Sequence, residues 1–243
     1  MVFLVFVLLA IASFVPGALP QEHISCLHDE LFEQTEEIND YFSENPATKN
    51  GFMIFCSLCM DITMVVGFVV FAIHGKTWRL PIALALFYVL RTIVQRLFLL
   101  RYPEGYLWDY PGFPSLVVPY GKTNDFFYSG HAGGATIMTL EYRTLAKLMP
   151  RHRVFMRAMQ GFGMLTVVFQ LFLMIFLRGH YTIDLLSGLI FGHYMYIMGS
   201  SFAPIFDRIV CKMGVEDSTK HHVIQNYEDK GETFVSETNA KSS

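Results

Sequence analysis

The sequence predicts an all-α membrane protein: a bundle of six transmembrane helices, or five if the first segment is a cleaved signal peptide. Two observations lead to this prediction. Hydrophobic residues make up 53% of the 243 residues and charged residues 16%, whereas soluble domains are about 45–50% apolar and about 25% charged. The apolar residues also gather in stretches of roughly 20, the length that crosses a bilayer.

The same composition argues against other classes of protein. A disordered chain would need low hydrophobicity and a high net charge. The net charge is only −3 and no basic face is evident, so nucleic acid is not an expected partner. An ordinary soluble enzyme would carry more charged residues than this chain does.

Two N-terminal segments precede the bundle. Residues 1–20 are interpreted as either a signal peptide or a first membrane helix, because they are apolar, short and kinked at Pro16 and Pro20. Residues 21–50 form an acidic segment with eight Asp or Glu side chains. This segment is expected to be a solvated, partly helical surface. Cation binding is the alternative, although no EF-hand spacing is present.

Five further stretches are expected to be membrane helices. With their connections they make residues 51–203 one transmembrane bundle, in which any catalytic residues are expected to lie. From Pro204 the sequence is polar and mixed in charge, so residues 204–243 are predicted to be a cytosolic tail. The predicted spans are Gly51–Ile73, Trp78–Leu100, Phe126–Met149, Val154–Leu177 and His180–Phe202.

Lysine and arginine predict the orientation, because they are enriched in cytosolic loops. The connection around Pro150 is the most basic, and the connection with Lys76 and Arg79 falls on the same side. The acidic segment and the 101–125 loop are therefore expected to be lumenal or extracellular, and the C-terminus cytosolic. These features describe a multi-pass protein of the Golgi, the endoplasmic reticulum or the plasma membrane. The basic residues near Pro150 are Lys147, Arg151, Arg153 and Arg157.

Two polar clusters open predicted spans at the same, lumenal depth: Asp125-Phe-Phe-Tyr-Ser-Gly-His131 and Arg178-Gly-His-Tyr-Thr-Ile-Asp184. Polar groups within spans are costly, so each needs a reason. His180 and Asp184 are four residues apart, and on a helix they would share a face and hydrogen-bond. That pairing would fix the tautomer of His180, as expected for an activated nucleophile or general base.

The first cluster is suited to binding phosphate. Ser129 is expected to cap the helix that follows, and backbone N–H groups near Gly130 and His131 would then form an anion site. His131 would add a second titratable proton donor. Together the two clusters suit phosphoryl transfer through a covalent intermediate. The alternative for each histidine alone is a packed interfacial side chain.

These motifs resemble those of a known family. Ser129-Gly130-His131, followed one span later by His180-Tyr-Thr-Ile-Asp184, is similar to the sphingomyelin synthases and to the plant-type phosphatidylcholine:diacylglycerol cholinephosphotransferases. Both belong to the type 2 phosphatidic acid phosphatase superfamily. The resemblance covers about residues 90–200. The motif that ends at His131 is more similar to that of the synthases, and the motif that ends at Asp184 is closer to that of the diacylglycerol transferases.

The resemblance implies a six-helix bundle with a lumen-facing site that opens sideways to lipid. It implies that His180 takes up the head-group phosphate as a phosphohistidine and that Asp184 orients and activates His180. His131 would protonate the leaving lipid alcohol and later deprotonate the acceptor hydroxyl. The implied reaction is a ping-pong exchange of a phospho-head group between two lipids.

Differences from the hydrolytic members of the superfamily favour a transferase. Those proteins have a Lys-x6-Arg-Pro block, whereas this chain has only Arg96-x4-Arg101-Tyr102-Pro103. They also have Pro before Ser-Gly-His, where this chain has Tyr128, and Arg six residues before the His of the other motif, where it has Met174.

Other polar and aromatic residues are candidates for substrate binding. Arg96 and Arg101 would either hold a phosphodiester by charge-assisted hydrogen bonds or serve the structure. Arg91 is expected to lie deeper and to neutralise Asp61.

The aromatic 101–128 loop is interpreted as an interfacial belt. A choline site at Trp108 or Tyr106 is the alternative, with charge from Asp109 or Asp125. The small-residue pairs Gly130-x3-Gly134 and Gly188-x3-Gly192 predict that the two motif-bearing helices cross near the site.

The sequence therefore predicts a head-group transferase that needs no metal or cofactor. It would move phosphocholine from phosphatidylcholine to a lipid alcohol, ceramide or diacylglycerol, with both substrates in the bilayer. A lipid phosphate phosphatase and a non-catalytic lipid-binding membrane protein are the alternatives. The expected catalytic residues are His131, His180 and Asp184, and the expected substrate-binding residues are Ser129, Gly130, Arg96, Arg101, Asp125, Tyr106 and Trp108.

Overall fold

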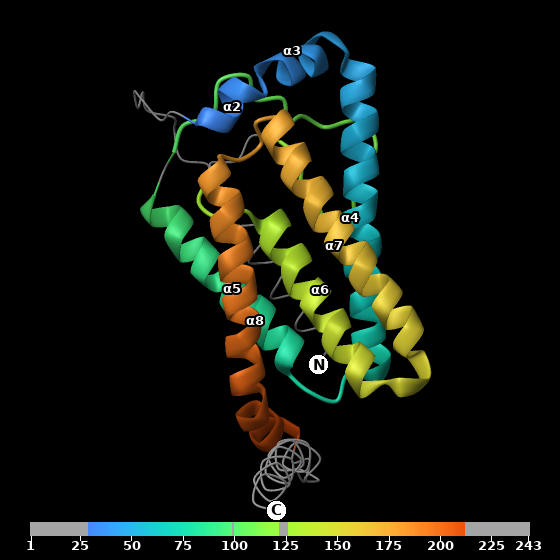
Figure 1. Ribbon diagram of the computed structural model, residues 1–243. Coiled ribbons are helices and arrows are strands. Elements are labelled where there is room, and N and C mark those ends of the chain that lie inside the picture. Colours follow the sequence, from blue (N-terminus) through green and yellow to red (C-terminus); the bar gives the residue numbers. More distant parts are fainter. Residues whose placement is uncertain (1–28, 99, 122–125, 212–243) are drawn as a thin grey trace, which may run out of the picture. The chain divides into compact units, whose positions relative to one another are not determined.

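The computed structural model describes residues 29–98, 100–121 and 126–211, and all regular structure within them is helical (Figure 1). The predictions for residues 1–20, for Asp125 and for most of the tail lie outside the described residues. The chain divides after Ala203 into two units, and the packing below concerns the first. The helices are α2 (Glu30–Gln34), α3 (Glu36–Glu44), α4 (Pro46–His74), α5 (Arg79–Leu97), α6 (Gly130–Leu148), α7 (Arg153–Phe176) and α8 (Thr182–Cys211), with a 3₁₀ turn at Pro150–His152.

Each predicted span contains one long helix, but several ends differ from the prediction. α5 ends at Leu97 because Phe98 is extended, with φ −124° and ψ 110°. α6 begins at Gly130 rather than Phe126, because Tyr128 has a φ of 39° that a helix does not accept. α8 begins at Thr182, so His180 precedes the helix.

Three helical segments of the described chain are long and apolar enough to cross a membrane: α4, α5 and Pro150–Phe176. The predicted count of six spans is therefore not confirmed. α6 carries Glu141 and Arg143 and begins with a glycine-rich turn, which lowers its apolar content.

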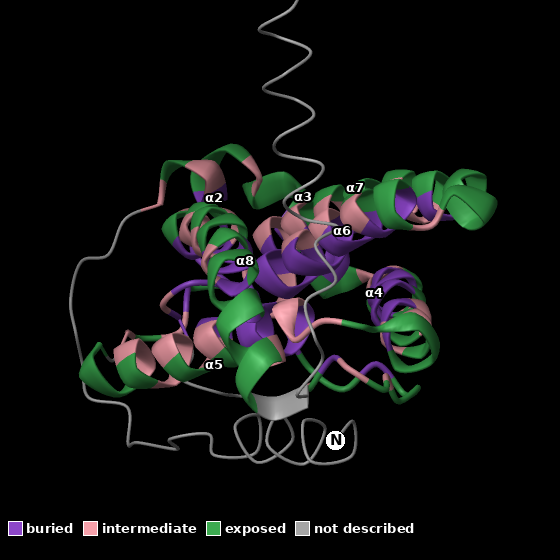
Figure 2. Cartoon of the chain, turned by 90° about the horizontal axis from the view of Figure 1, so that it is seen from below, coloured by how far each residue is buried: buried purple, intermediate pink, exposed green. Residues whose placement is uncertain are grey.

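α6 tolerates this composition because it lies at the centre of the bundle. Figure 2 shows its buried surface between α4, α5, α7 and α8. Buried residues occur on every face of α6, and Glu141 is only 2% exposed. A helix surrounded by protein does not need an apolar surface toward lipid.

Glycine lets α8 approach α6 closely, as the sequence predicted. A Cβ added to Gly188 would lie 2.7 Å from the carbonyl oxygen of Ser129, and one added to Gly192 would lie 2.7 Å from that of Gly133. The α6 side of the crossing is Gly133, not the predicted pair. Gly134 instead faces Met64 and Tyr88.

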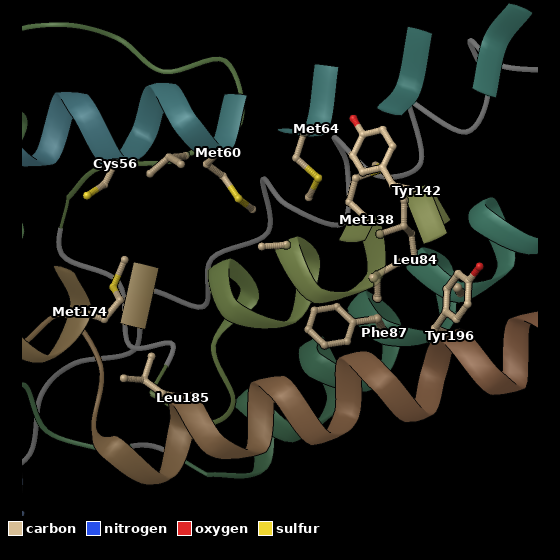
Figure 3. Close-up of a cluster of buried hydrophobic side chains, with 14 of the residues drawn as sticks. Cys56, Met60, Met64, Leu84, Phe87, Met138, Tyr142, Met174, Leu185 and Tyr196 are labelled. Carbon is tan, nitrogen blue, oxygen red and sulfur yellow. The ribbon is translucent and has the colours of Figure 1, made fainter. Parts of the chain in front are cut away.

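Polar side chains join α4 to α6 and α7 inside the apolar core. The hydroxyls of Thr63 and Thr166 are 3.0 Å apart, Gln170 donates to the carbonyl of Cys56 (2.8 Å), and Tyr142 donates to that of Thr63 (2.7 Å). Hydrogen bonds of this kind join helices where lipid offers no partner. Methionine and aromatic side chains fill the space around them (Figure 3).

A buried ion pair joins α5 to α6 near the turn between α6 and α7. Arg79 donates through Nε and Nη2 to the two carboxylate oxygens of Glu141 (2.9 and 2.7 Å). The hydroxyl of Tyr196 on α8 lies 3.0 Å from the same carboxylate and 2.7 Å from Thr144 Oγ1. This network connects three helices at the end opposite the two sequence motifs.

Candidate active site

The two motifs meet where α6 and α8 begin. The backbone N–H of Ser129 donates to the carbonyl of Asp184 (2.8 Å), and Gly188 packs on the Ser129 backbone. Ser129 caps α6 as predicted, its hydroxyl accepting from the N–H of Ala132 at 3.4 Å. The first turn of α6 therefore lies beside the first turn of α8.

His180 and Asp184 lie close together, but the predicted hydrogen bond is not formed: within the described part of the chain Nδ1 of His180 has no hydrogen-bond partner. Nδ1 of His180 lies 3.5 Å from Oδ2 of Asp184, although His180 precedes the helix. The same carboxylate oxygen accepts from the N–H of Tyr181 (3.2 Å), which holds it toward the turn. The two residues are 2% and 0% exposed, so the pair is shielded from solvent.

His131 lies next to this pair. Its ring centroid is 6.0 Å from that of His180, with the planes inclined by 64°. Trp108 also contacts His131 edge to face, at 5.5 Å between centroids. The structure thus brings together all three residues predicted to be catalytic, with the two imidazole rings in an edge-to-face arrangement.

Each of the two polar clusters contains one strained residue. Among the described non-glycine residues, Tyr128 and Arg178 have positive φ, at 39° and 52°. Such conformations cost about 1–3 kcal/mol and persist only where the surroundings enforce them. Tyr128 is fully buried, donates its hydroxyl to the carbonyl of Phe87 (2.6 Å) and stacks on Phe191.

Arg178 occupies the left-handed position that ends α7. Its N–H bonds to the carbonyl of Ile175 (3.1 Å), and the N–H of Gly179 bonds to that of Met174 (2.9 Å). This is a Schellman motif, which usually has glycine in the place of Arg178. The guanidinium secures the turn by donating to the carbonyls of Glu104 (2.7 Å) and Phe32 (3.2 Å).

The other predicted binding residues divide into two groups. Trp108 is buried beside His131, and its indole N–H donates to the carbonyl of Pro119 (3.2 Å). Tyr106 packs on Phe126, which in turn contacts His180. Arg101 and Arg96, by contrast, are both exposed, Arg96 on α5.

Arg91, on α5, lies beside the start of α6. The prediction of an Asp61–Arg91 pair is wrong. Nε of Arg91 donates to the carbonyl of Tyr128 (3.2 Å), and a Cβ added to Gly130 would lie 3.3 Å from its guanidinium carbon. Asp61 instead binds Ser115 and the backbone after it. A positive charge therefore lies beside the motif that ends at His131.

The acidic segment also contributes to the site, and no sequence pattern indicates this role. Asp29 accepts from the backbone N–H and the hydroxyl of Thr182 (2.7 and 2.9 Å), the first residue of α8. The buried Asn39 amide donates to the carbonyls of Gly105 (3.0 Å) and Phe176 (2.7 Å). The prediction of a partly helical segment is confirmed, but one side of it packs on the turn that carries His180.

The electrostatics of the site favour an anion held near two imidazoles. The N-terminus of α6, a guanidinium and two histidines offer donors, while Asp184 supplies one carboxylate. The Tyr181 hydroxyl, next to His180 in the chain, donates to the Arg101 carbonyl (3.0 Å). Among the described residues, no group of three His, Cys, Asp or Glu side chains is arranged to hold a metal ion.

Comparison with known proteins identifies the family of the chain. A model of the AtPDCT1/2 family, the phosphatidylcholine:diacylglycerol cholinephosphotransferases, matches residues 28–201. Searches of curated proteins and of solved structures found no match. The matched range covers both motifs, all of α2 to α7 and most of α8. The chain therefore belongs to the phosphatidylcholine:diacylglycerol cholinephosphotransferase family.

Proposed function

We propose that this protein transfers phosphocholine from phosphatidylcholine to diacylglycerol by way of a phosphohistidine on His180. The observation that carries the proposal is the buried His180–Asp184 pair beside His131 at the N-terminus of α6. The family match supplies the substrate class. The catalytic roles proposed below are those that the resemblance of the sequence motifs implies.

In the first half-reaction Nε2 of His180 attacks the phosphorus of phosphatidylcholine. The Asp184 carboxylate lies 3.5 Å from Nδ1, and in the reacting complex it would accept the Nδ1 proton in a hydrogen bond, which leaves the lone pair on Nε2. The bond between phosphorus and the glycerol oxygen breaks as the N–P bond forms. Protonated His131 gives its proton to the leaving oxygen, which departs as diacylglycerol.

In the second half-reaction an incoming diacylglycerol reverses these steps. His131, now neutral, takes the proton from the acceptor hydroxyl, whose oxygen attacks the phosphorus. The N–P bond breaks, and a new phosphatidylcholine leaves while His180 returns to its starting state. The charge on the phosphoryl oxygens would be stabilised by the α6 N-terminus near Gly130, and Arg91 adds positive charge there.

Aromatic side chains near His131 suit a quaternary ammonium group. Trp108 is buried against the His131 ring, Phe126 contacts His180, and Tyr106 packs on Phe126. Such faces attract cations. The family's cholinephosphotransferase activity favours choline over other head groups, and no observation favours ceramide as the acceptor.

We also propose that the site faces the lumen or the cell exterior, with the C-terminus cytosolic. The support is the distribution of basic residues. Arg151 and Arg153 are exposed at the turn between α6 and α7, at the opposite end of α6 from Ser129. Such residues are enriched on the cytosolic side.

The test is a transfer assay on the full-length protein in liposomes. The donor is phosphatidylcholine labelled in the choline phosphate, and the acceptor is diacylglycerol with acyl chains of a different length. We expect label in phosphatidylcholine that carries the acceptor's chains. Release of free phosphate from phosphatidic acid, or no reaction with either lipid, would contradict the transferase.

A further measurement tests the intermediate. Without acceptor, labelled donor should leave an acid-labile, alkali-stable phosphoryl group on the protein, and His180→Asn should abolish it. His193→Asn is the matched control, because His193 lies on α8, the helix that follows His180, and its side chain is exposed. Full turnover in the His180 variant would refute the nucleophile. In the transfer assay with diacylglycerol, ceramide is included as a competing acceptor.

A further inference from the structure

The connection between α5 and α6 returns to the side of α4. The Asp61 carboxylate accepts from Ser115 Oγ (2.6 Å) and from the backbone N–H groups of Leu116 and Val117 (each 3.0 Å). Ser115 Oγ also accepts from the N–H of Val118 (2.9 Å). One carboxylate thus holds several consecutive residues of the connection against the helix.

Asp61 lies deep along α4. It is the only charged residue in the apolar stretch Gly51–Ile73, and α4 is long and apolar enough to span a membrane. Ten residues separate it from Gly51, which corresponds to about 15 Å along a helix. The hydrocarbon core is about 30 Å thick, so a segment bound to Asp61 reaches the middle of the bilayer.

The sequence of residues 110–121 suits that depth. It contains no Asp, Glu, Lys, Arg or His, and it is bounded by Asp109 and Lys122. Irregular backbone is tolerated at membrane depth only where it is buried in protein or lines a water-filled cavity, so that its polar groups find partners. Prolines at 111, 114 and 119 have no N–H to satisfy, and Asp61 and Ser115 bind the N–H groups of residues 116–118.

The side chains of this segment point in two directions, some into the bundle core and some away from it. Val118 is 4% exposed and belongs to the bundle core. Phe113 and Leu116 are 58% and 82% exposed and point away from it. On α4, Leu58 lies about one turn before Asp61 and Val65 about one turn after it. Both side chains are also exposed and apolar.

We propose that residues 110–121 form a re-entrant loop whose backbone is held against α4, with the side chains of Phe113 and Leu116 in contact with the acyl chains of the surrounding lipids. Asp61 anchors the loop at that depth. The base of the loop contacts the site, because the Trp108 indole that packs on His131 donates to the carbonyl of Pro119. The proposal rests on α4 crossing the membrane and not on the transfer reaction.

Thiol accessibility in lipid nanodiscs tests the proposal. The variants are Leu116→Cys, Phe113→Cys and, as a control, Tyr41→Cys on α3, where Tyr41 is 51% exposed. All carry Cys26→Ser and Cys211→Ser, and the native Cys56 and Cys59 are buried. We expect a permanently charged thiol reagent to react about 100-fold more slowly at 113 and 116 than at 41, because charge is excluded from hydrocarbon.

Fluorescence quenching identifies what covers the loop. An uncharged fluorophore attached at 116 should be quenched more strongly by phosphatidylcholine with a nitroxide in mid-chain than by one with a nitroxide on the head group. Rapid labelling at 116, equal to that at 41, would mean that the loop lies in water and would overturn the proposal. Slow labelling without quenching by either lipid would mean that protein covers it, and would overturn the proposal as well.

Discussion

Asp29 caps the first turn of α8 by accepting both the backbone N–H and the hydroxyl of Thr182. The same carboxylate accepts from the N–H of Leu31 (3.2 Å), so one side chain caps two helices. A negative charge is favourable at a helix N-terminus. Asp184 follows Thr182 by two residues, so the cap helps to fix the turn that carries the proposed nucleophile.

Replacing Asp29 by alanine should therefore weaken both the fold and the activity. Loss of an N-cap costs about 0.5–2 kcal/mol, and we expect Asp29→Ala to lower the free energy of unfolding by about 1 kcal/mol and to reduce turnover. Asp40→Ala is the matched control, since Asp40 is exposed on α3. Thermal unfolding in detergent and the transfer assay measure the two effects. Equal behaviour of the two variants would refute the role of the cap.

The local parts of the site could be predicted from the sequence. Ser129 is expected to be an N-cap because serine accepts backbone bonds before a helix, and the structure confirms it. The close crossing at Gly188 and Gly192 follows from small residues at helical spacing. These features depend on a few adjacent residues, so a sequence carries them directly.

The long-range parts could not be predicted in this way. Asp61 binds residues more than 50 positions away, and Asp29 binds Thr182 across 153 positions. No periodicity or spacing encodes a side chain that binds a distant backbone. The positive φ of Tyr128 is likewise unfavourable for an isolated tyrosine, and it is held by contacts with Phe87 and Phe191.

Arg91 offers a test of the strained turn before α6. Nε of Arg91 donates to the Tyr128 carbonyl. The side-chain amide of Gln95, with its oxygen toward Arg91, accepts from the guanidinium. A hydrogen bond to a charged group contributes about 1.5–3 kcal/mol. Arg91→Met should therefore lose most of the transfer activity, and Arg91→Lys should retain a part of it.

Arg96→Met serves as the control for that prediction, because Arg96 lies on the same helix, α5. It should keep activity near that of the unmodified protein. Transfer rates measured at several donor concentrations distinguish weaker binding from slower chemistry. If Arg96→Met were the more damaging change, the phosphodiester would be held by Arg96 and not by Arg91.

The crossing of α6 and α8 can be tested by adding one methyl group. At Gly192 a Cβ would lie 2.7 Å from the Gly133 carbonyl oxygen, whereas at Gly161 on α7 it meets nothing within 4 Å. Overpacking costs about 1–3 kcal/mol, while alanine in an open helical position is favourable by about 0.5–1 kcal/mol. Gly192→Ala should lower the melting temperature and Gly161→Ala should leave it unchanged or higher. A stable Gly192→Ala variant would contradict the close packing.

The Arg79–Glu141 pair should stabilise the bundle without taking part in catalysis, because it lies at the other end of α6 from Ser129. The two side chains are only 12% and 2% exposed, and leaving one buried charge without its partner costs about 3–5 kcal/mol. Glu141→Gln should therefore lower the melting temperature strongly, and Tyr196→Phe, which removes one neutral donor, should lower it by less.

Arg79→Met combined with Glu141→Leu should recover much of the stability lost in Glu141→Gln, because an apolar pair leaves no charge uncompensated. Thermal unfolding of the four proteins, with turnover per folded molecule measured alongside, checks this. A fall in turnover of the folded fraction would show that this end of the bundle is coupled to the site.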